Sequence, residues 1–155
     1  SVYQLEITVE VSGIINYSDG IYYIVMDADG NSATGPEYDI PLWEDRFYYI
    51  KLEYGSFDFA QVQDDFPSIF YGGIVSGNKI QAMIALSDLG DPNSIDINVV
   101  TTDSDNHTYD HLGNYFTINT TLGSTTTVEA SEGDSGDGGA DFDIVKVTAI
   151  VTTLY

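Results

Sequence analysis

The feature that most constrains this chain of 155 residues is the alternation of apolar and polar side chains along short segments. The first eleven residues set the pattern, with polar neighbours between Tyr3, Leu5, Ile7, Val9 and Val11. Successive side chains of a β-strand point to opposite faces, so one face of this segment is expected to be buried and the other solvated. No stretch shows a sustained helical period, and the chain is therefore predicted to be all-β.

Turn residues divide the sequence into short strands. Gly, Asn, Asp or Pro, which tight turns require, stand between the apolar runs, for example at 18–20, 29–31 and 76–78. Strands are predicted at 2–11, 21–26, 46–54, 56–63, 69–75, 79–86, 95–101, 115–121 and 142–154. A total of about nine or ten strands predicts a two-layer antiparallel β-sandwich of jelly-roll-like character.

The length predicts a single domain spanning residues 1–155. Within it, segment 129–141 is rich in Gly and Asp and has no hydrophobic side chain larger than Ala. This segment is predicted to be a loop of the same domain, because the strong strand pattern at 142–154 follows it and needs a sheet to join. The density of like charge suggests that a cation or a neighbouring surface holds the loop.

The charge balance excludes several classes of partner. The chain has 25 acidic residues against 4 Lys and Arg, a net charge of −21, so it cannot neutralise a row of phosphates or approach an anionic membrane favourably. No apolar run approaches the ~20 residues that cross a bilayer. We therefore expect neither nucleic-acid binding nor membrane insertion. With no Cys, disulfides and thiolate metal sites are excluded.

The chain begins in a strand pattern without an initiator Met, which we interpret as the mature form of an exported protein. Three glycosylation sequons begin at Asn16, Asn106 and Asn119, as an extracellular surface would tolerate. An extracellular or cell-surface location is the expectation.

Acidic clusters are the candidate metal ligands, because Ca²⁺ prefers several carboxylate and carbonyl oxygens. The predicted Ca²⁺ ligands are Asp27, Asp29 and Asn31 in one cluster, Asp103, Asp105 and Asp110 in a second, and Asp134 and Asp137 in a third. The alternative is that these residues only serve turn geometry. His107 and His111 are four residues apart, but their loop-like surroundings disfavour a transition-metal site.

Aromatic residues are the candidate sugar platforms. Tyr22-Tyr23 and Tyr48-Tyr49 each place one ring on either face of a strand, so the outward rings could stack on a sugar. The predicted carbohydrate-binding residues are Trp43, Tyr22 and Tyr48. The alternative is ordinary tyrosines of a strand surface.

Two segments carry a family resemblance. Residues 22–36, from Tyr22-Tyr23-Ile24-Val25-Met26 to Thr34-Gly35-Pro36, and residues 84–103 resemble strand and turn segments of the DOMON and family-nine carbohydrate-binding superfamily of secreted β-sandwiches. The resemblance spans roughly residues 5–118 and implies a jelly-roll-like sandwich that binds sugars, haem or other proteins. The haem-binding and sugar-binding branches use Met and His ligands or paired Trp rings, whereas Trp43 is the single Trp here.

Two functions from different classes follow. The first is a non-enzymatic structural subunit of a cell-surface filament, a homopolymer in which a terminal strand, at 2–11 or 142–154, completes the sheet of a neighbour, with calcium bridging the acidic copies. The second is a carbohydrate-binding module that attaches to a polysaccharide through outward aromatic rings. Gly133-Asp134-Ser135-Gly136 is similar to a serine-protease nucleophile motif, but it lies in an open acidic segment and no His stands in a matching motif. Nothing marks a specific pair of catalytic acids either, so the protein is expected not to be an enzyme.

Overall fold

The computed structural model describes residues 2–16, 18–28, 47–61, 67–130 and 140–154. Within these ranges the chain forms twelve strands and two short 3-10 helices. In chain order they are β1 (Tyr3–Val11), β2 (Ile21–Asp27), β3 (Phe47–Glu53), β4 (Ser56–Gln61), β5 (Ser68–Ile69), β6 (Gly73–Ser76), β7 (Lys79–Ala85), η1 (Leu86–Leu89), β8 (Ser94–Thr102), β9 (Thr108–His111), β10 (Phe116–Asn119), β11 (Thr125–Glu129), η2 (Ala140–Phe142) and β12 (Ile144–Thr153).

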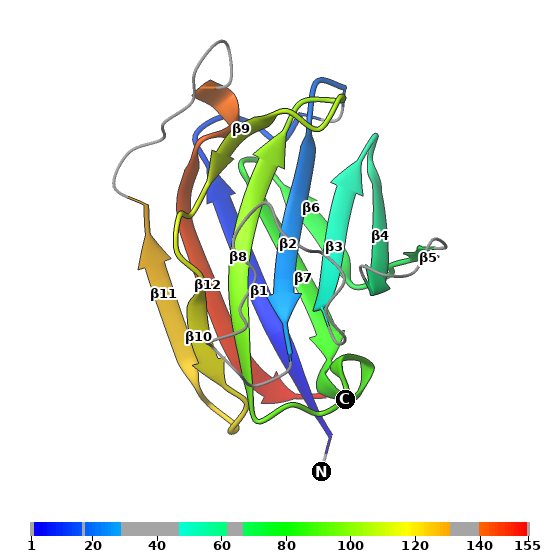
Figure 1. Ribbon diagram of the computed structural model, residues 1–155, viewed down its shortest axis with the longest axis vertical. Helices are drawn as coiled ribbons and strands as arrows, with labels where there is room; N and C mark the ends of the chain where they lie inside the picture. Colours follow the sequence, from blue (N-terminus) through cyan, green and yellow to red (C-terminus); the bar gives the residue numbers. More distant parts are fainter. Residues whose placement is uncertain (1, 17, 29–46, 62–66, 131–139, 155) are drawn as a thin grey trace.

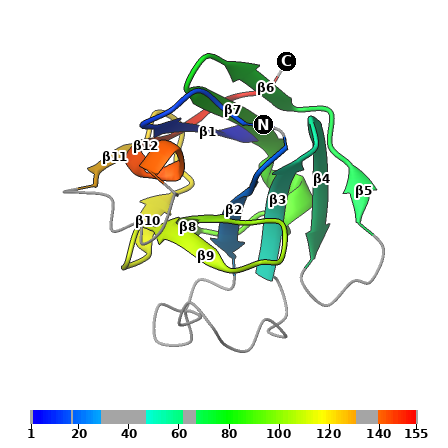
Figure 2. The same cartoon turned by 90° about the horizontal axis from the view of Figure 1, so that it is seen from above.

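The strands form two antiparallel sheets that pack face to face (Figures 1 and 2). Sheet A has the order β11-β12-β1-β7-β6, and sheet B has the order β10-β8-β2-β3-β4-β5, with β9 pairing along β8 beside β10. The chain therefore passes from sheet A to sheet B and back twice before it ends in sheet A. The predicted all-β sandwich of two antiparallel layers is confirmed.

One core fills the space between the sheets. Leu5, Ile7 and Val9 of β1 are at most 1% exposed and belong to the same buried cluster as Ile24 and Met26 of β2. These residues occupy alternate positions, so the alternation in the sequence directly selects the inward face of each strand. Burial of such side chains contributes about 1.5–3 kcal/mol each and is the main stabilising term of the sandwich.

Both terminal strands lie inside sheet A. β1 pairs with β12 on one side and with β7 on the other, and β12 lies between β11 and β1. Among the described residues, the edges of sheet A are β6 and β11, and the edges of sheet B are β5 on one side and β9 with β10 on the other. Each terminal strand thus has two neighbours within its own chain.

The strand predictions need two corrections. The single strand predicted at 69–75 is wrong, because β5 belongs to sheet B, β6 belongs to sheet A, and the chain crosses between the sheets at Phe70–Gly72. A Cβ atom on Gly72 would collide with the carbonyl oxygen of Met83, so the crossing depends on a residue without a side chain. The count of nine or ten strands was too low, since β9 and β11 are short, polar edge strands without an apolar alternation.

The predicted acidic loop at 129–141 is only partly described. Glu129 is the last residue of β11, and Ala140 and Asp141 begin η2. Residues 131–139 lie outside the described ranges. Neither 3-10 helix of the described chain has the length or apolar character of a membrane-spanning helix.

Candidate functional site

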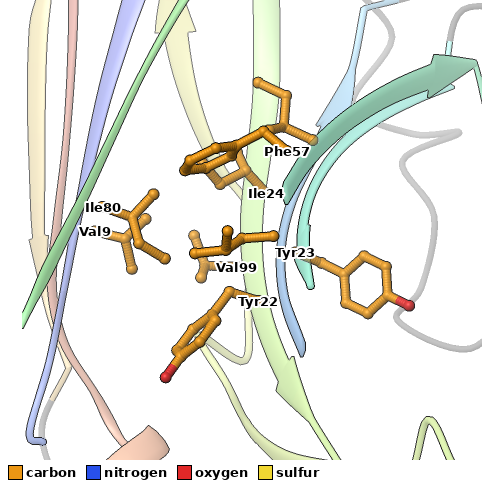
Figure 3. A pocket seen from close by; sticks show the side chains of 9 residues that line it. Val9, Tyr22, Tyr23, Ile24, Phe57, Ile80 and Val99 are labelled. Carbon is orange, nitrogen blue, oxygen red and sulfur yellow. The ribbon is translucent and has the colours of Figure 1, made fainter. Parts of the chain in front are cut away.

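The outer face of sheet B carries more buried polar groups than a solvated sheet surface would. It is formed by the side chains that alternate with the core residues of its three central strands, namely Tyr23, Val25 and Asp27 of β2, Tyr49, Lys51 and Glu53 of β3, and Asp96, Asn98 and Val100 of β8. Figure 3 shows the two faces of β2 at neighbouring residues: Tyr22 is directed among the core side chains, and Tyr23 is directed to the opposite side of the sheet. The small apolar space between the sheets in that view belongs to the core.

Tyr23 and Tyr49 form an aromatic pair on this face. Their ring centroids are 6.1 Å apart with an edge-on angle of 72°. The Tyr23 hydroxyl donates a hydrogen bond of 2.8 Å to the Asn106 side-chain oxygen, which comes from the loop between β8 and β9. Burial, with smaller contributions from the charges of Glu53 and Tyr49, raises the pKa of Tyr23 to about 12. These rings are therefore half-buried and held in place.

The predicted sugar platforms Tyr22 and Tyr48 are wrong in their orientation. Tyr22 is 3% exposed and packs against Phe142, with ring centroids 5.3 Å apart and the rings tilted by 31°. Tyr48 is 9% exposed and stacks on Phe59 at 5.6 Å. Both side chains face the core, because they stand at the same alternate positions as the apolar core residues of β2 and β3. Their chain neighbours Tyr23 and Tyr49 are the residues whose rings point outward. Trp43, the third predicted residue, lies outside the described residues.

Two carboxylates lie opposite each other on this face. Asp27 of β2 and Asp96 of β8 are direct partners in the antiparallel register, and they are only 1% and 7% exposed. The Thr117 hydroxyl of β10 donates a hydrogen bond to Asp96. Burial, followed by the charges of these two carboxylates, raises the pKa of Tyr115. Like charges at such cross-strand positions destabilise a sheet, so their placement requires compensating donors.

The adjacent polar group Asn98 joins this face to the β9–β10 connection. Asn98 is fully buried, and its side-chain oxygen accepts a hydrogen bond of 3.2 Å from the backbone N–H of Leu112. Sequence reasoning identified Asp27 but missed Asp96, Asn98 and Tyr115. The alternation pattern could have identified Asp96 and Asn98, because these two residues alternate with the core residues Ile95 and Ile97 along β8.

The loop between β8 and β9 holds the one group of potential metal ligands among the described residues: Asp103, Asp105 and His107. One Asp103 carboxylate oxygen accepts backbone N–H bonds from Asp105 at 2.9 Å and from His107 at 2.8 Å, and its other oxygen lies 3.2 Å from His107 Nδ1. The backbone N–H of His107 is the main cause that lowers the pKa of Asp103. The cluster thus first stabilises its own turn, and it offers a cation two carboxylates and one imidazole.

Asp110 lies apart from this cluster. It is 7% exposed, and its side chain accepts a hydrogen bond of 2.8 Å from the buried backbone N–H of Ile144. Its placement as a ligand beside Asp103 and Asp105 is therefore a wrong prediction, because β9 turns this side chain inward. Asp27 is buried and lies away from this loop, at the end of β2 opposite the residue that pairs with Thr102. Four further predicted ligands lie outside the described residues: Asp29, Asn31, Asp134 and Asp137.

The three sequon asparagines lie in different surroundings. Asn106 is exposed and adopts a left-handed φ of 64°, and Asn119 is exposed at the end of β10. The Asn16 side-chain oxygen instead accepts hydrogen bonds from the backbone N–H groups of Ser18 and Asp19. Asn106 and Asn119 are therefore the more exposed positions, and the Asn106 side-chain oxygen also accepts the hydrogen bond from Tyr23.

Comparison with protein-family models, with curated proteins and with solved structures finds no match for this chain. The resemblance to the DOMON and family-nine superfamily stays a prediction. The class of protein that the structure itself defines is an acidic, all-β sandwich.

Proposed function

We propose that this protein is a non-enzymatic structural protein of the cell surface, a subunit whose copies associate into a filament or a similar assembly. The observation that carries the proposal is the distribution of basic side chains. Of the three basic residues in the described ranges, Lys79 and Lys146 lie on the outer face of sheet A, and only Lys51 lies elsewhere. This face is formed by the side chains of sheet A that alternate with its core residues.

The distribution of basic side chains matters because the protein has a large net negative charge. Two copies that each carry −21 repel each other, so stable contact needs a surface on which the charges nearly cancel. The outward positions of sheet A carry Lys79 and Lys146 against Glu6, Glu10 and Glu129. A face with a net charge close to zero is the surface on which self-association is least opposed.

The extracellular location is supported by exposed sequons at Asn106 and Asn119. The non-enzymatic assignment is supported by the placement of the two histidines. His107 is 81% exposed beside Asp103, and His111 lies on the exposed side of β9, where its Nδ1 accepts the Gly113 N–H at 2.9 Å. Both imidazole rings thus make their contacts within their own surface loops.

Strand complementation takes a particular form in this fold. Because β1 and β12 are interior strands, donation to a neighbour requires that one of them leaves its own sheet and takes the same place in the next copy. This is strand exchange, which conserves every pair of the native register. It predicts that β1 of one copy pairs with β12 of another in the assembled state.

Cysteine pairs test this exchange. Val9 and Val147 are direct partners in the β1–β12 register, and both face the core, so a disulfide between them reports strand pairing and not contact between outer faces. Chains carrying Val9→Cys alone and chains carrying Val147→Cys alone are mixed, assembled and oxidised. Strand exchange predicts a disulfide between the two chains. A disulfide that forms only within the double variant V9C/V147C would reject exchange as the route of assembly.

Calcium bridging remains part of the proposal. Asp103 and Asp105 are close together in an exposed loop, where a divalent cation could join them to carboxylates of a neighbouring copy. A hard cation prefers oxygen ligands, so the two carboxylates and not the imidazole of His107 would bind it.

Polysaccharide binding is the second candidate function, favoured by the outward Tyr23 and Tyr49 rings. They lie beside Lys51 and Glu53, which form an ion pair of 3.3 Å on the same strand and face. Aromatic rings bordered by charged and hydrogen-bonding groups are typical of surfaces that bind sugars. Retention on insoluble polysaccharide is the corresponding measurement.

A further inference from the structure

A ladder of alternating charge crosses four strands of sheet A. Glu129 of β11 is the register partner of Lys146 of β12, Lys146 is the partner of Glu10 of β1, and Glu10 is the partner of Lys79 of β7. The four side chains point outward, and the Lys79 and Glu10 charges are 3.6 Å apart. The order across the sheet is therefore minus, plus, minus, plus, which we call the charge ladder.

We infer that the charge ladder is the contact by which the outer face of sheet A binds the same face of a second copy, around a two-fold axis that runs parallel to the strands between β12 and β1. This inference rests on the proposed self-association and names its partner surface. Rotation about that axis reverses the order of the ladder. Glu129 then faces Lys79 of the second copy, and Lys146 faces its Glu10.

The same axis brings uncharged groups together in the next row. Thr127, Thr148, Thr8 and Gln81 are successive register partners across the sheet, so Thr148 faces Thr8 and Thr127 faces Gln81. Small hydroxyl groups permit close approach of the two sheets. Glu6 is the remaining charge on this face, and its carboxylate accepts a hydrogen bond of 2.9 Å from Gln81 Nε2 of its own copy.

The face is open and large enough for a weak specific contact. In Figure 2 no described strand or helix lies on the outer side of sheet A. Five strands spaced ~4.8 Å apart and about seven residues in length cover roughly 20 Å by 24 Å, about 500 Å² per copy. A pair would bury about 1,000 Å², the lower limit for a specific interface, and a face that is mainly polar, with Ile74, Met83 and Ile150 as its apolar members, predicts a reversible contact.

Two variants whose ladders carry opposite charges test the inference, and sedimentation equilibrium measures their association. The variant K79E/K146E has an all-negative ladder, and the variant E10K/E129K has an all-positive one. Each alone should self-associate at least about tenfold more weakly than the wild type, because like charges then face each other. An equimolar mixture should regain association in a complex that contains one chain of each kind. Circular dichroism confirms that each variant is folded.

General charge effects are separated by a matched control. D88K/D91K changes the net charge by the same amount as E10K/E129K, but it alters exposed residues in and after η1 and leaves the ladder intact. This control should not form a specific pair with K79E/K146E. Wild-type chains that stay monomeric under all conditions would reject the proposed assembly itself. Wild-type association that neither variant weakens, or a mixture that regains nothing, would reject the charge ladder alone.

Discussion

The carboxylate of Asp110 accepts a hydrogen bond of 2.8 Å from the backbone N–H of Ile144, and this bond joins the edge strand β9 of sheet B to the first residue of β12 in sheet A. The two residues are 34 positions apart in the sequence and both are buried. The bond therefore connects the two layers at one end of the sandwich. An acidic residue whose charge suggested a calcium ligand has a structural role here.

Replacing Asp110 is expected to destabilise the fold. Asp110→Ala leaves the Ile144 N–H buried without its acceptor, which should lower the free energy of unfolding by about 2–3 kcal/mol. Asp110→Asn keeps a side-chain oxygen and should lose less. Urea denaturation measures both, with the exposed Asp88→Ala as the control. If Asp110→Ala unfolds at the same urea concentration as that control, the link between the layers contributes nothing to stability.

The raised pKa of Tyr23 predicts that the protein loses stability in alkaline solution. Its pKa rises from 10.0 to about 12 on folding, so the folded state holds the phenol proton more tightly than the unfolded state. The resulting stability is fully present below pH 10 and is lost as the pH rises towards 12. The free energy of unfolding should therefore fall less steeply over this range in Tyr23→Phe than in the wild type. Tyr71→Phe, which alters a ring that is 88% exposed, is the matched control and should follow the wild type.

Calcium should raise the melting temperature if the loop between β8 and β9 binds it. Binding to the folded state alone stabilises a protein in proportion to the logarithm of ligand concentration. D103N/D105N should abolish that increase, whereas D88N/D91N, which removes two other exposed carboxylates, should retain it. Thermal unfolding with calcium chloride and then with a chelator makes the comparison. Equal losses in the two variants would show only a general effect of net charge.

Polysaccharide retention separates the outward from the inward tyrosines. Y23A/Y49A should weaken retention by about tenfold, equivalent to ~1.4 kcal/mol, because the variant removes both outward rings. Tyr71→Ala removes an exposed ring on the connection between β5 and β6 and should bind as the wild type does. Affinity electrophoresis in gels with a soluble polysaccharide measures the difference. Unchanged mobility of Y23A/Y49A would count against sugar binding on sheet B.

The alternation of side chains determined the class of fold because burial acts locally on each strand. Leu5, Ile7 and Val9 define the inward face of β1 without reference to any other part of the chain, and the same holds for β2, β7 and β8. Turn residues then determined most strand boundaries. β9 and β11 could not be found in this way, because edge strands with polar side chains are stabilised by the neighbour with which they pair.

Only the tertiary structure decided which groups meet. The apolar alternation of β2 and β3 already indicates that Tyr22 and Tyr48 face the core, but only the pairing of the two strands brings Tyr23 and Tyr49 together on the outer face. The opposition of Asp27 to Asp96, the bond from Ile144 to Asp110 and the charge ladder all depend on strands that are distant in sequence. Their positions follow from sheet order and register, which arise from the packing of the whole core, whereas a strand's alternation depends only on its own residues.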